Sequence, residues 1–317
     1  MSPIGRLAPS PTGAQHLGNA RTFLLAWLSL RARSGKIILR IEDIDSPRVK
    51  PWAAEQAVED LRWLGLDWDE GPDRPGPQAP YFQTQRSDAY ASALERLRRA
   101  EQVFPCTCTR SDIATAASAP HAGQEGPVYP GTCSSRRAGD AIDLRPPFAW
   151  RFRLGQGPAA FHDRFAGPQT VRLEQLGDFV VYKSNGTPSY QLAVVVDDWA
   201  MGVTEVVRGD DLLPSTFRQL ALYSFFNWQP PDFYHVPLVV GEDGRRLAKR
   251  HGDTRLATLR RQGIRPEVVV GWLAWSAGLL EQPQPIRPRD LLPEWNWNRI
   301  HRRRWTWNPA ILNKWKC

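Results

Sequence analysis

The chain has 317 residues, and its 41 lysines and arginines exceed its 33 aspartates and glutamates, which gives a formal net charge of +8. Hydrophobic residues make up 42% of the chain and charged residues 23%, which fits one or two folded domains and excludes a mainly disordered or coiled-coil chain. The apolar runs at residues 23–30 and 268–280 are too short to span a bilayer, and residues 1–10 lack the apolar region of a signal peptide. We therefore expect a cytoplasmic protein that makes no membrane contact.

The beginning of the chain predicts a βαβ unit. Residues 4–8 predict a short buried strand, the loop PSPTG follows at residues 9–13, and a helix is expected over residues 18–33, where Gly35 stops it. The β-branched residues 36–41 predict the next strand. A strand, a helix and a strand of these lengths form a parallel pair with a right-handed connection, so the expected fold class is α/β.

The rest of the chain predicts helices and strands around an irregular insertion. Residues 106–133 contain several prolines and glycines and a run of small residues, which indicates the insertion. Strands are expected at residues 150–154, 179–183, 203–208 and 233–240. Helices are expected at residues 52–64, 86–101, 212–226, 256–261 and 267–278.

The first loop leads into His16, Gly18 and Asn19 at the expected start of a helix. A helix N-terminus offers exposed backbone N–H groups and the positive end of the helix dipole, which suits a phosphate. His16 and Asn19 could add two side-chain donors, and Gly18 would let the ligand approach. The alternative is that a glycine and a histidine at a helix start are purely structural.

A second candidate is the cationic loop GEDGRRLAKR at residues 241–250, which follows an expected strand. This loop could close over a nucleotide and bring Lys249 to its phosphates. Taken alone, the loop is better explained as a solvated basic turn.

Together the two loops resemble the catalytic core of the class I aminoacyl-tRNA synthetases. HLGN at residues 16–19 stands in place of the first family signature, H-I-G-H, and RLAKR at residues 246–250 in place of the second, K-M-S-K-S. Four further segments resemble the glutamyl and glutaminyl branch: RLAPSPTG at 6–13, LRIEDID at 39–45, YQLAVVVDD at 190–198 and VRGDDLL at 207–213. This resemblance covers roughly residues 4–255 and implies a Rossmann-type parallel sheet.

The resemblance implies a site for L-glutamate, which needs fixed cations for two carboxylates and one anion for an ammonium group. Its expected residues are Arg6, Ala8, Ser10, Glu42, Tyr190 and Arg208. Arg6 and Arg208 would pair with carboxylates, and Glu42 with the ammonium group. For Glu42 and Arg208, the alternative is an ordinary ion pair at the rim of the sheet.

The resemblance also implies ATP as a substrate together with Mg²⁺. The residues expected to bind ATP are His16, Gly18, Asn19, Arg246 and Lys249. His16, Asn19 and Lys249 would be the catalytic groups, because they would stabilise charge on the transferring phosphate. Arg246 replaces the usual lysine and Ala248 the usual serine, so we expect activity with altered loop dynamics.

Three cysteines that are close in the sequence predict a metal site rather than a disulfide scaffold: Cys106, Cys108 and Cys133. A tetrahedral structural zinc site needs a fourth ligand, and the candidates are Tyr129, His121 and Asp112. Ligand chemistry alone favours His121, whereas a resemblance to the zinc site of the glutamyl-Q tRNA(Asp) synthetases implies Tyr129. The remaining alternative is a set of reduced, metal-free thiols.

The resemblance implies four segments along the chain. Residues 1–102 and 179–255 would form the two halves of the nucleotide-binding catalytic domain, residues 103–178 an inserted, acceptor-like zinc-binding subdomain, and residues 256–317 a short helical, basic and tryptophan-rich region. We expect no anticodon-binding domain, since few residues follow Lys249, and we expect a monomer.

A chain shortened in this way is similar to the glutamyl-Q tRNA(Asp) synthetases, which implies transfer of glutamate to the queuosine base of tRNA(Asp). One alternative is a compact glutamyl-tRNA synthetase that charges tRNA(Glu), and another is a non-catalytic RNA-binding paralogue. Basic residues gather at 245–261 and at 299–304, with tryptophans among the second group. This suits an RNA partner, although a solvated basic face above buried tryptophans explains it equally well.

Overall fold

The computed structural model describes residues 2–44, 49–109, 111–113, 127–245, 247 and 254–308. Within this part of the chain, no helix is both long and apolar enough to cross a membrane. Several residues named above lie outside the described residues: Asp45, His121, Arg246, Ala248, Lys249 and Arg250.

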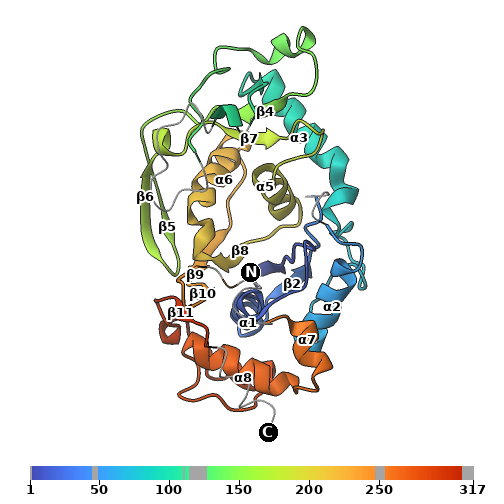
Figure 1. Cartoon of the computed structure of the whole chain (residues 1–317), viewed down its shortest axis with the longest axis vertical. Helices are drawn as coiled ribbons and strands as arrows, with labels where there is room; N and C mark the ends of the chain where they lie inside the picture. Colours follow the sequence, from blue (N-terminus) through green and yellow to red (C-terminus); the bar gives the residue numbers. More distant parts are fainter. Residues whose placement is uncertain are drawn as a thin grey trace.

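A four-stranded parallel sheet forms the centre of the molecule (Figure 1). Its strands are β1 (Ile4–Leu7), β2 (Lys36–Leu39), β8 (Glu205–Gly209) and β9 (Asp232–Val236), in the order β2-β1-β8-β9. Helix α1 (Leu17–Arg31) joins β1 to the parallel strand β2, which confirms the predicted βαβ unit. The chain leaves β1 and β8 in opposite directions across the sheet, and such a reversal opens a crevice at the carboxyl ends of the two strands.

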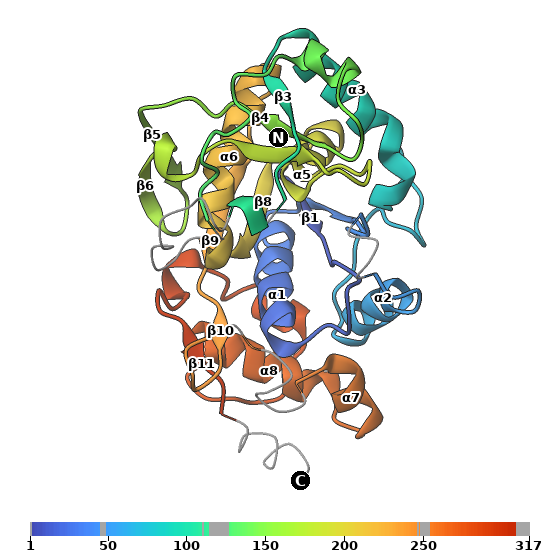
Figure 2. The ribbon, with the colours of Figure 1, turned by 45° about the horizontal axis from the view of Figure 1, so that its top comes forward.

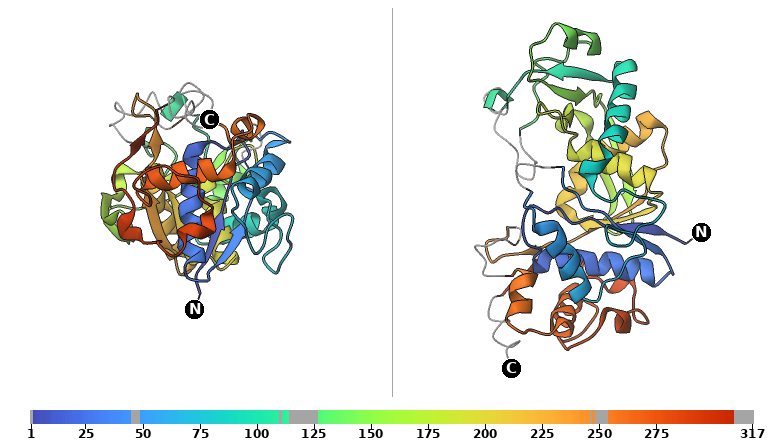
Figure 3. Two further views of the ribbon diagram at one scale, coloured as in Figure 1. Left: turned by 90° about the horizontal axis from the view of Figure 1, so that it is seen from below. Right: turned by 90° about the vertical axis from the view of Figure 1, so that its right-hand side faces the viewer.

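Helices cover both faces of this sheet, as the right-hand view of Figure 3 shows. Helix α1 packs with α8 (Pro266–Ala277) on one face, while α5 (Tyr190–Ala200) and α6 (Leu213–Phe226) pack together on the other. Strand β8 is buried along its whole length, as expected for a parallel strand covered on both sides. Two hydrophobic clusters result, one around Trp27 and Trp272 and one around the valines of α5.

A second, antiparallel layer lies at the far end of the molecule from α8 (Figure 2). It consists of β3 (Val103–Cys106), β4 (Ala149–Phe152) and β7 (Phe179–Tyr182), in the order β3-β4-β7. A separate hairpin of β5 (Pro158–Asp163) and β6 (Gly167–Arg172) contacts β9 and α6. Strands β3, β5 and β6 and helix α5 are not among the predicted elements.

The strand predicted at residues 233–240 is divided into two. Strand β9 ends at Val236, and the short β10 (Val239–Val240) pairs with β11 (Trp305–Thr306) instead of the central sheet. Pro237 lies between them, and a proline cannot donate a backbone hydrogen bond to continue a ladder. The tryptophan-rich end of the described chain is therefore attached to the strand that leads into the second signature loop.

The remaining helices follow the predicted pattern. Helix α2 (Ala53–Trp63) contacts α7 (Leu256–Arg261), and α3 (Ser87–Arg99) contacts α5 and β3. Short 3₁₀ helices cover Gln83–Arg86, Ala138–Ile142, Leu173–Gln175, Asp210–Leu212, Pro288–Leu291 and Trp297–Arg299.

Candidate active site

A cavity of about 730 Å³ opens at the carboxyl ends of β1 and β8. This is where the reversal of strand order predicts a ligand crevice. Residues from segments far apart in the sequence meet there, so the resemblance and the fold lead to the same place. The cavity is lined by every predicted glutamate and ATP residue that the structure describes: Arg6, Ala8, Ser10, His16, Gly18, Asn19, Glu42, Tyr190 and Arg208.

His16 caps the N-terminus of α1 with its own side chain. Its Nδ1 accepts hydrogen bonds from the backbone N–H groups of Gly18 and Asn19, at 3.1 and 3.4 Å. Because Nδ1 is an acceptor, a neutral His16 carries its proton on Nε2. A Cβ on Gly18 would lie only 3.0 Å from the His16 ring, so the absence of a side chain at this position also makes room for the cap.

The prediction of exposed backbone N–H groups at this helix end is wrong. The N–H of Leu17 donates to the carbonyl of Thr254 and that of Ala20 to the carbonyl of His16, while His16 Nδ1 takes the two between them. The side chain of His16 satisfies two of the backbone N–H groups that were expected to be exposed. A phosphate here would meet side chains and the helix dipole rather than free amides.

A buried charge cluster lies beside Arg6 and Glu42 at the wall of the cavity. The fully buried Arg40 lies 2.7 Å from Asp198, 3.1 Å from Glu42 and 3.8 Å from Asp197. Arg6 Nε lies 3.5 Å from Asp198. Burial raises the pKa of Glu42, and the positive charges of Arg40 and Arg6 oppose this rise. Arg6 and Glu42 thus line the cavity, but each already interacts with a charged neighbour within the protein.

Sequence reasoning missed the supporting roles of Arg40 and Asp197. Asp197 also accepts hydrogen bonds from Arg86 and Gln83, at 2.6 and 2.8 Å. The available signal was a charged residue within each apolar motif, LRIEDID and YQLAVVVDD, because a charge in such a run is buried and must be paired. Lys183 and Asp211 line the cavity as well.

Arg208 is in a different situation from Arg6 and Arg40. It is buried at the end of β8, and its guanidinium donates to Tyr190, Thr216, Gln219 and the Nε2 of His235, at 2.8–3.4 Å. None of these partners is a carboxylate, and no described residue forms an ion pair with Arg208. The alternative of an ordinary ion pair between Arg208 and Glu42 is therefore wrong, and no described carboxylate pairs with the guanidinium of Arg208 beside the cavity.

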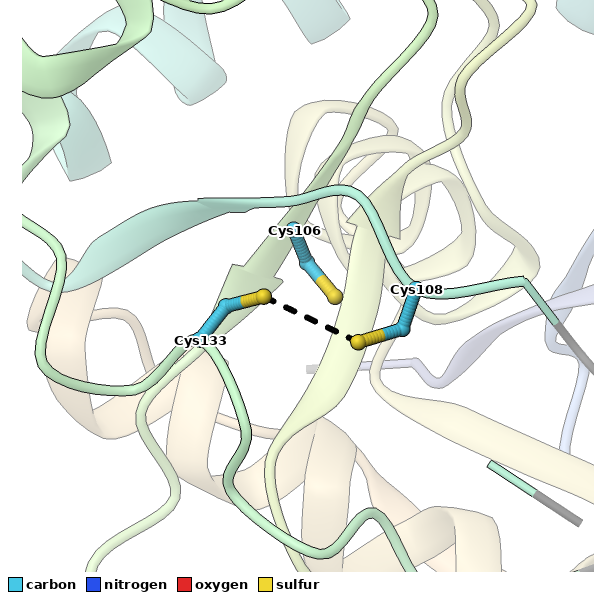
Figure 4. Close-up of side chains that lie close together, drawn as sticks. All are labelled: Cys106, Cys108 and Cys133. Atoms are coloured by element: carbon cyan, nitrogen blue, oxygen red, sulfur yellow. Dashed lines mark hydrogen bonds between the residues drawn. The ribbon is translucent and has the colours of Figure 1, made fainter. Parts of the chain in front are cut away.

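The three predicted cysteines converge at one point in the antiparallel layer (Figure 4). Their sulfur atoms all lie within 4.8 Å of one another, and those of Cys108 and Cys133 are 3.7 Å apart. The hydroxyl of Tyr129 lies 3.5 Å from the Cys106 sulfur and 4.0 Å from that of Cys108. The cluster could hold a metal ion, whereas His121 lies outside the described residues.

Arg151 approaches this cluster from β4. Its Nε donates to the Cys106 sulfur at 3.2 Å, and its guanidinium lies 4.0 Å from the centre of the Tyr129 ring. This guanidinium places a positive charge against the Cys106 sulfur, where it would offset part of the negative charge that several anionic ligands give to a metal site.

The late basic cluster is used largely within the chain. Arg302 donates to the backbone of Phe165, and Arg304 donates to Asp210 at 3.1 and 3.4 Å. Trp307 is buried, and Trp305 is partly buried against the same core. The tryptophans of this segment that the structure describes therefore support the packing alternative.

Comparison with known proteins agrees with this geometry. The sequence profile described as "tRNA synthetases class I (E and Q), catalytic domain" matches residues 4–281. A curated relative from Rhodopirellula baltica, named glutamyl-Q tRNA(Asp) synthetase, is 51% identical over 95% of this chain and 95% of its own length. A relative with the same name from Symbiobacterium thermophilum is 53% identical over 94% of each chain.

A solved structure shares the whole fold. The glutamate-tRNA synthetase from Elizabethkingia anophelis superimposes with a TM-score of 0.84 and is 28% identical. The match covers 99% of this chain and 70% of that one.

Proposed function

Because this chain belongs to the class I tRNA synthetases of the glutamyl and glutaminyl branch, we propose that it activates L-glutamate with ATP and transfers it to the queuosine base of tRNA(Asp). The single observation that carries the glutamate assignment is Arg208, a buried cation beside the cavity that no described carboxylate neutralises. An anionic substrate group supplies the missing charge.

The first step needs no nucleophile from the protein. The α-carboxylate of glutamate attacks the α-phosphorus of ATP. The bond between this phosphorus and the oxygen that bridges to the β-phosphate breaks, and glutamyl-adenylate and pyrophosphate are formed. Catalysis then consists of positioning the reactants and stabilising the charge that develops on the phosphate. A cavity of about 730 Å³ is large enough to hold both reactants.

In the proposed glutamate site, Arg208 and Arg6 bind carboxylates and Glu42 binds the ammonium group. Arg208 is the stronger electrostatic partner, because Arg6 already faces Asp198. The hydroxyl of Tyr190, which accepts a bond from Arg208 at 3.4 Å, closes the site from the side of α5. Ser10 and the backbone of Ala8 complete the hydrogen bonds.

In the proposed ATP site, His16 donates from Nε2 to the phosphates, since its Nδ1 is occupied by the helix cap. Gly18 gives space, and Asn19 adds an amide whose orientation is fixed by a 2.9 Å bond to Gln15. Arg246 and Lys249 provide positive charge from the second signature loop. Mg²⁺ supplies further neutralisation of the phosphates when it is bound with ATP.

We also propose one structural Zn²⁺ per chain, bound by Cys106, Cys108, Cys133 and Tyr129 within an inserted subdomain at residues 103–178. A tetrahedral site with zinc bonds of about 2.3 Å to sulfur and 2.0 Å to oxygen has edges of about 3.8 Å and 3.5 Å. The distance of 3.7 Å between the Cys108 and Cys133 sulfurs and the sulfur–oxygen distances of 3.5 and 4.0 Å fit these edges, and all three sulfurs lie within 4.8 Å of one another. The N–H of Cys133 donates to the Tyr129 oxygen at 2.7 Å, which opposes the rise that burial causes in the pKa of Tyr129.

Metal analysis of protein purified without added zinc should find about one equivalent per chain. Tyr129→Phe should lower the zinc affinity by about tenfold or more in a chelator competition, because it removes one of four ligands. The matched variant is His121→Ala, which should leave the affinity unchanged. Loss of zinc in His121→Ala together with normal binding in Tyr129→Phe would move the fourth ligand to His121.

The queuosine acceptor rests on the relatives that share this chain's extent. The two relatives described above that are named glutamyl-Q tRNA(Asp) synthetase match over 94–95% of their own lengths at 51–53% identity, whereas the glutamate-tRNA synthetase structure is matched over 70% at 28% identity. The alternative, a compact glutamyl-tRNA synthetase, uses the same activation step and differs only in the acceptor.

Labelled glutamate should be transferred to queuosine-containing tRNA(Asp) and not to the same tRNA without queuosine. Periodate treatment that oxidises the 3′ diol and spares queuosine should leave this transfer intact. Label on tRNA(Glu) alone, and only with an intact 3′ end, would establish the compact glutamyl-tRNA synthetase instead. Absence of glutamate-dependent ATP–pyrophosphate exchange would point to the non-catalytic paralogue.

A further inference from the structure

A buried chain of three side chains leads away from the cavity behind Arg208. Arg208 on β8 and His235 on β9 are register partners in adjacent parallel strands, and the Nε of Arg208 lies 2.9 Å from the Nε2 of His235. The other ring nitrogen of His235, Nδ1, lies 2.6 Å from a carboxylate oxygen of Asp163 at the end of β5. All three side chains are buried.

The hydrogen bonds of this chain fix the proton on His235. Oδ1 of Asp163 accepts the backbone N–H groups of Phe165, Ala166 and His235, so Oδ2 remains to accept from His235 Nδ1. Nε2 is then an acceptor, as the always-protonated guanidinium requires. Burial lowers the pKa of His235 to about 4, and this keeps the ring neutral at physiological pH.

We propose that Asp163 and His235 position Arg208 for glutamate, with a neutral histidine holding the guanidinium so that its charge remains for the substrate. This inference rests on the proposed glutamate site. A carboxylate in direct contact with Arg208 would orient it equally well, but it would also neutralise it and compete with the substrate carboxylate. The imidazole lies between Asp163 and Arg208. It therefore orients the guanidinium while it keeps the negative charge of Asp163 out of direct contact with it.

The proposal gives the β5–β6 hairpin a role in substrate selection. Asp163 is the last residue of β5 and lies 72 residues before His235 in the sequence. Phe161 and Phe233 pack against the imidazole, with ring centroids 6.5 and 6.1 Å away. Asp163 and His235 are positioning residues, since they act on glutamate only through Arg208.

Asp163→Asn tests the proposal, because it changes the polarity of one bond and preserves the shape of the side chain. The amide oxygen keeps the three backbone N–H groups, so the amide NH₂ faces His235 Nδ1 and shifts the imidazole proton to Nε2, where it opposes the N–H of Arg208. The KM for glutamate in ATP–pyrophosphate exchange should rise about tenfold or more, and the KM for ATP should stay within about twofold. The matched control is Asp232→Asn, which removes an exposed ion pair with Arg164.

A double-mutant cycle separates positioning from a general loss of structure. In His235→Phe the ring has no hydrogen-bonding nitrogen and cannot couple residue 163 to Arg208, so adding Asp163→Asn to this variant should change the glutamate KM by less than about twofold. An equal effect of Asp163→Asn in both backgrounds, or equal rises in the glutamate and ATP KM values, would overturn the proposal.

The tautomer can be measured in the wild-type protein without any variant or substrate. The ¹⁵N chemical shifts of His235 should show a neutral ring with its proton on Nδ1 between pH 6 and 8. A proton on Nε2, or a charged ring, would overturn the proposal even if glutamate is the substrate. If the tautomer is as expected but glutamate supports no ATP–pyrophosphate exchange, the proposed function is wrong. The proposed role of Asp163 and His235 in glutamate binding is then wrong as well.

Discussion

Replacing Arg208 with glutamine should reduce kcat/KM for glutamate by about thirtyfold to several thousandfold in ATP–pyrophosphate exchange. The guanidinium is buried, and its hydrogen-bond partners among the described residues are all neutral, so in this variant a substrate carboxylate loses its charge partner. Truncating one partner of such a pair costs about 2–5 kcal/mol, and each 1.4 kcal/mol corresponds to a factor of ten.

The conservative variant Arg208→Lys distinguishes charge from geometry. A lysine keeps the charge but cannot donate to His235, Thr216 and the substrate at once from a planar fork, so we expect activity between that of the glutamine variant and that of the wild type. ATP–pyrophosphate exchange with glutamine in place of glutamate shows which carboxylate Arg208 binds, since glutamine lacks only the side-chain carboxylate. If Arg208 binds that carboxylate, Arg208→Gln should affect the exchange with glutamine less than the exchange with glutamate. A wild-type kcat/KM in Arg208→Gln would remove Arg208 from the glutamate site.

Local patterns in the sequence predict the central sheet and the position of the cavity. The apolar runs that form β1 and β2 flank a helix of suitable length, and chirality then determines how the unit is wound. Motif residues such as Arg6 and Arg208 lie next to the last residue of a parallel strand, and the carboxyl ends of such strands lie at one edge of the sheet. The nine described residues expected to bind substrates therefore lie around one cavity.

The parts that the sequence does not predict depend on contacts between distant segments. Helix α5 contains consecutive valines, which favour strands, yet Ser189 caps it through the N–H of Leu192, and burial between α3 and α6 stabilises it. Asp163 reaches His235 only because the β5–β6 hairpin folds against β9. Neither residue has a neighbour in the sequence that indicates its partner.

The side chain of His16 has a structural role that the sequence does not predict. Its position at the start of α1 suggests a phosphate ligand, and the structure adds that Nδ1 caps the helix. One ring nitrogen therefore has a structural role, and Nε2 is the nitrogen that we propose donates to the phosphates. Periodicity and motif spacing do not distinguish the two nitrogens, because the cap depends on the backbone geometry of the first turn.

The second large effect is expected for Lys249, which lies in the second signature loop. The described residues on either side of 248–253 are attached beside the start of α1. The N–H of Leu247 donates to the carbonyl of Val239, which lines the cavity, and Thr254 accepts from the N–H of Leu17. Leu247 and Thr254 therefore lie on the side of the cavity proposed for ATP.

Lys249→Ala should lower kcat for glutamate-dependent ATP–pyrophosphate exchange by about a hundredfold. The ammonium group would stabilise negative charge that grows on the phosphates during adenylate formation, and loss of one such contact costs about 3 kcal/mol. The KM for glutamate should change little, because the interaction strengthens in the transition state. Arg245→Ala is the matched control, since it removes one exposed positive charge from the same loop and should leave kcat within about twofold. Equal losses in the two variants would mean that the loop acts through its overall charge, and an unchanged kcat in Lys249→Ala would exclude Lys249 as a catalytic residue.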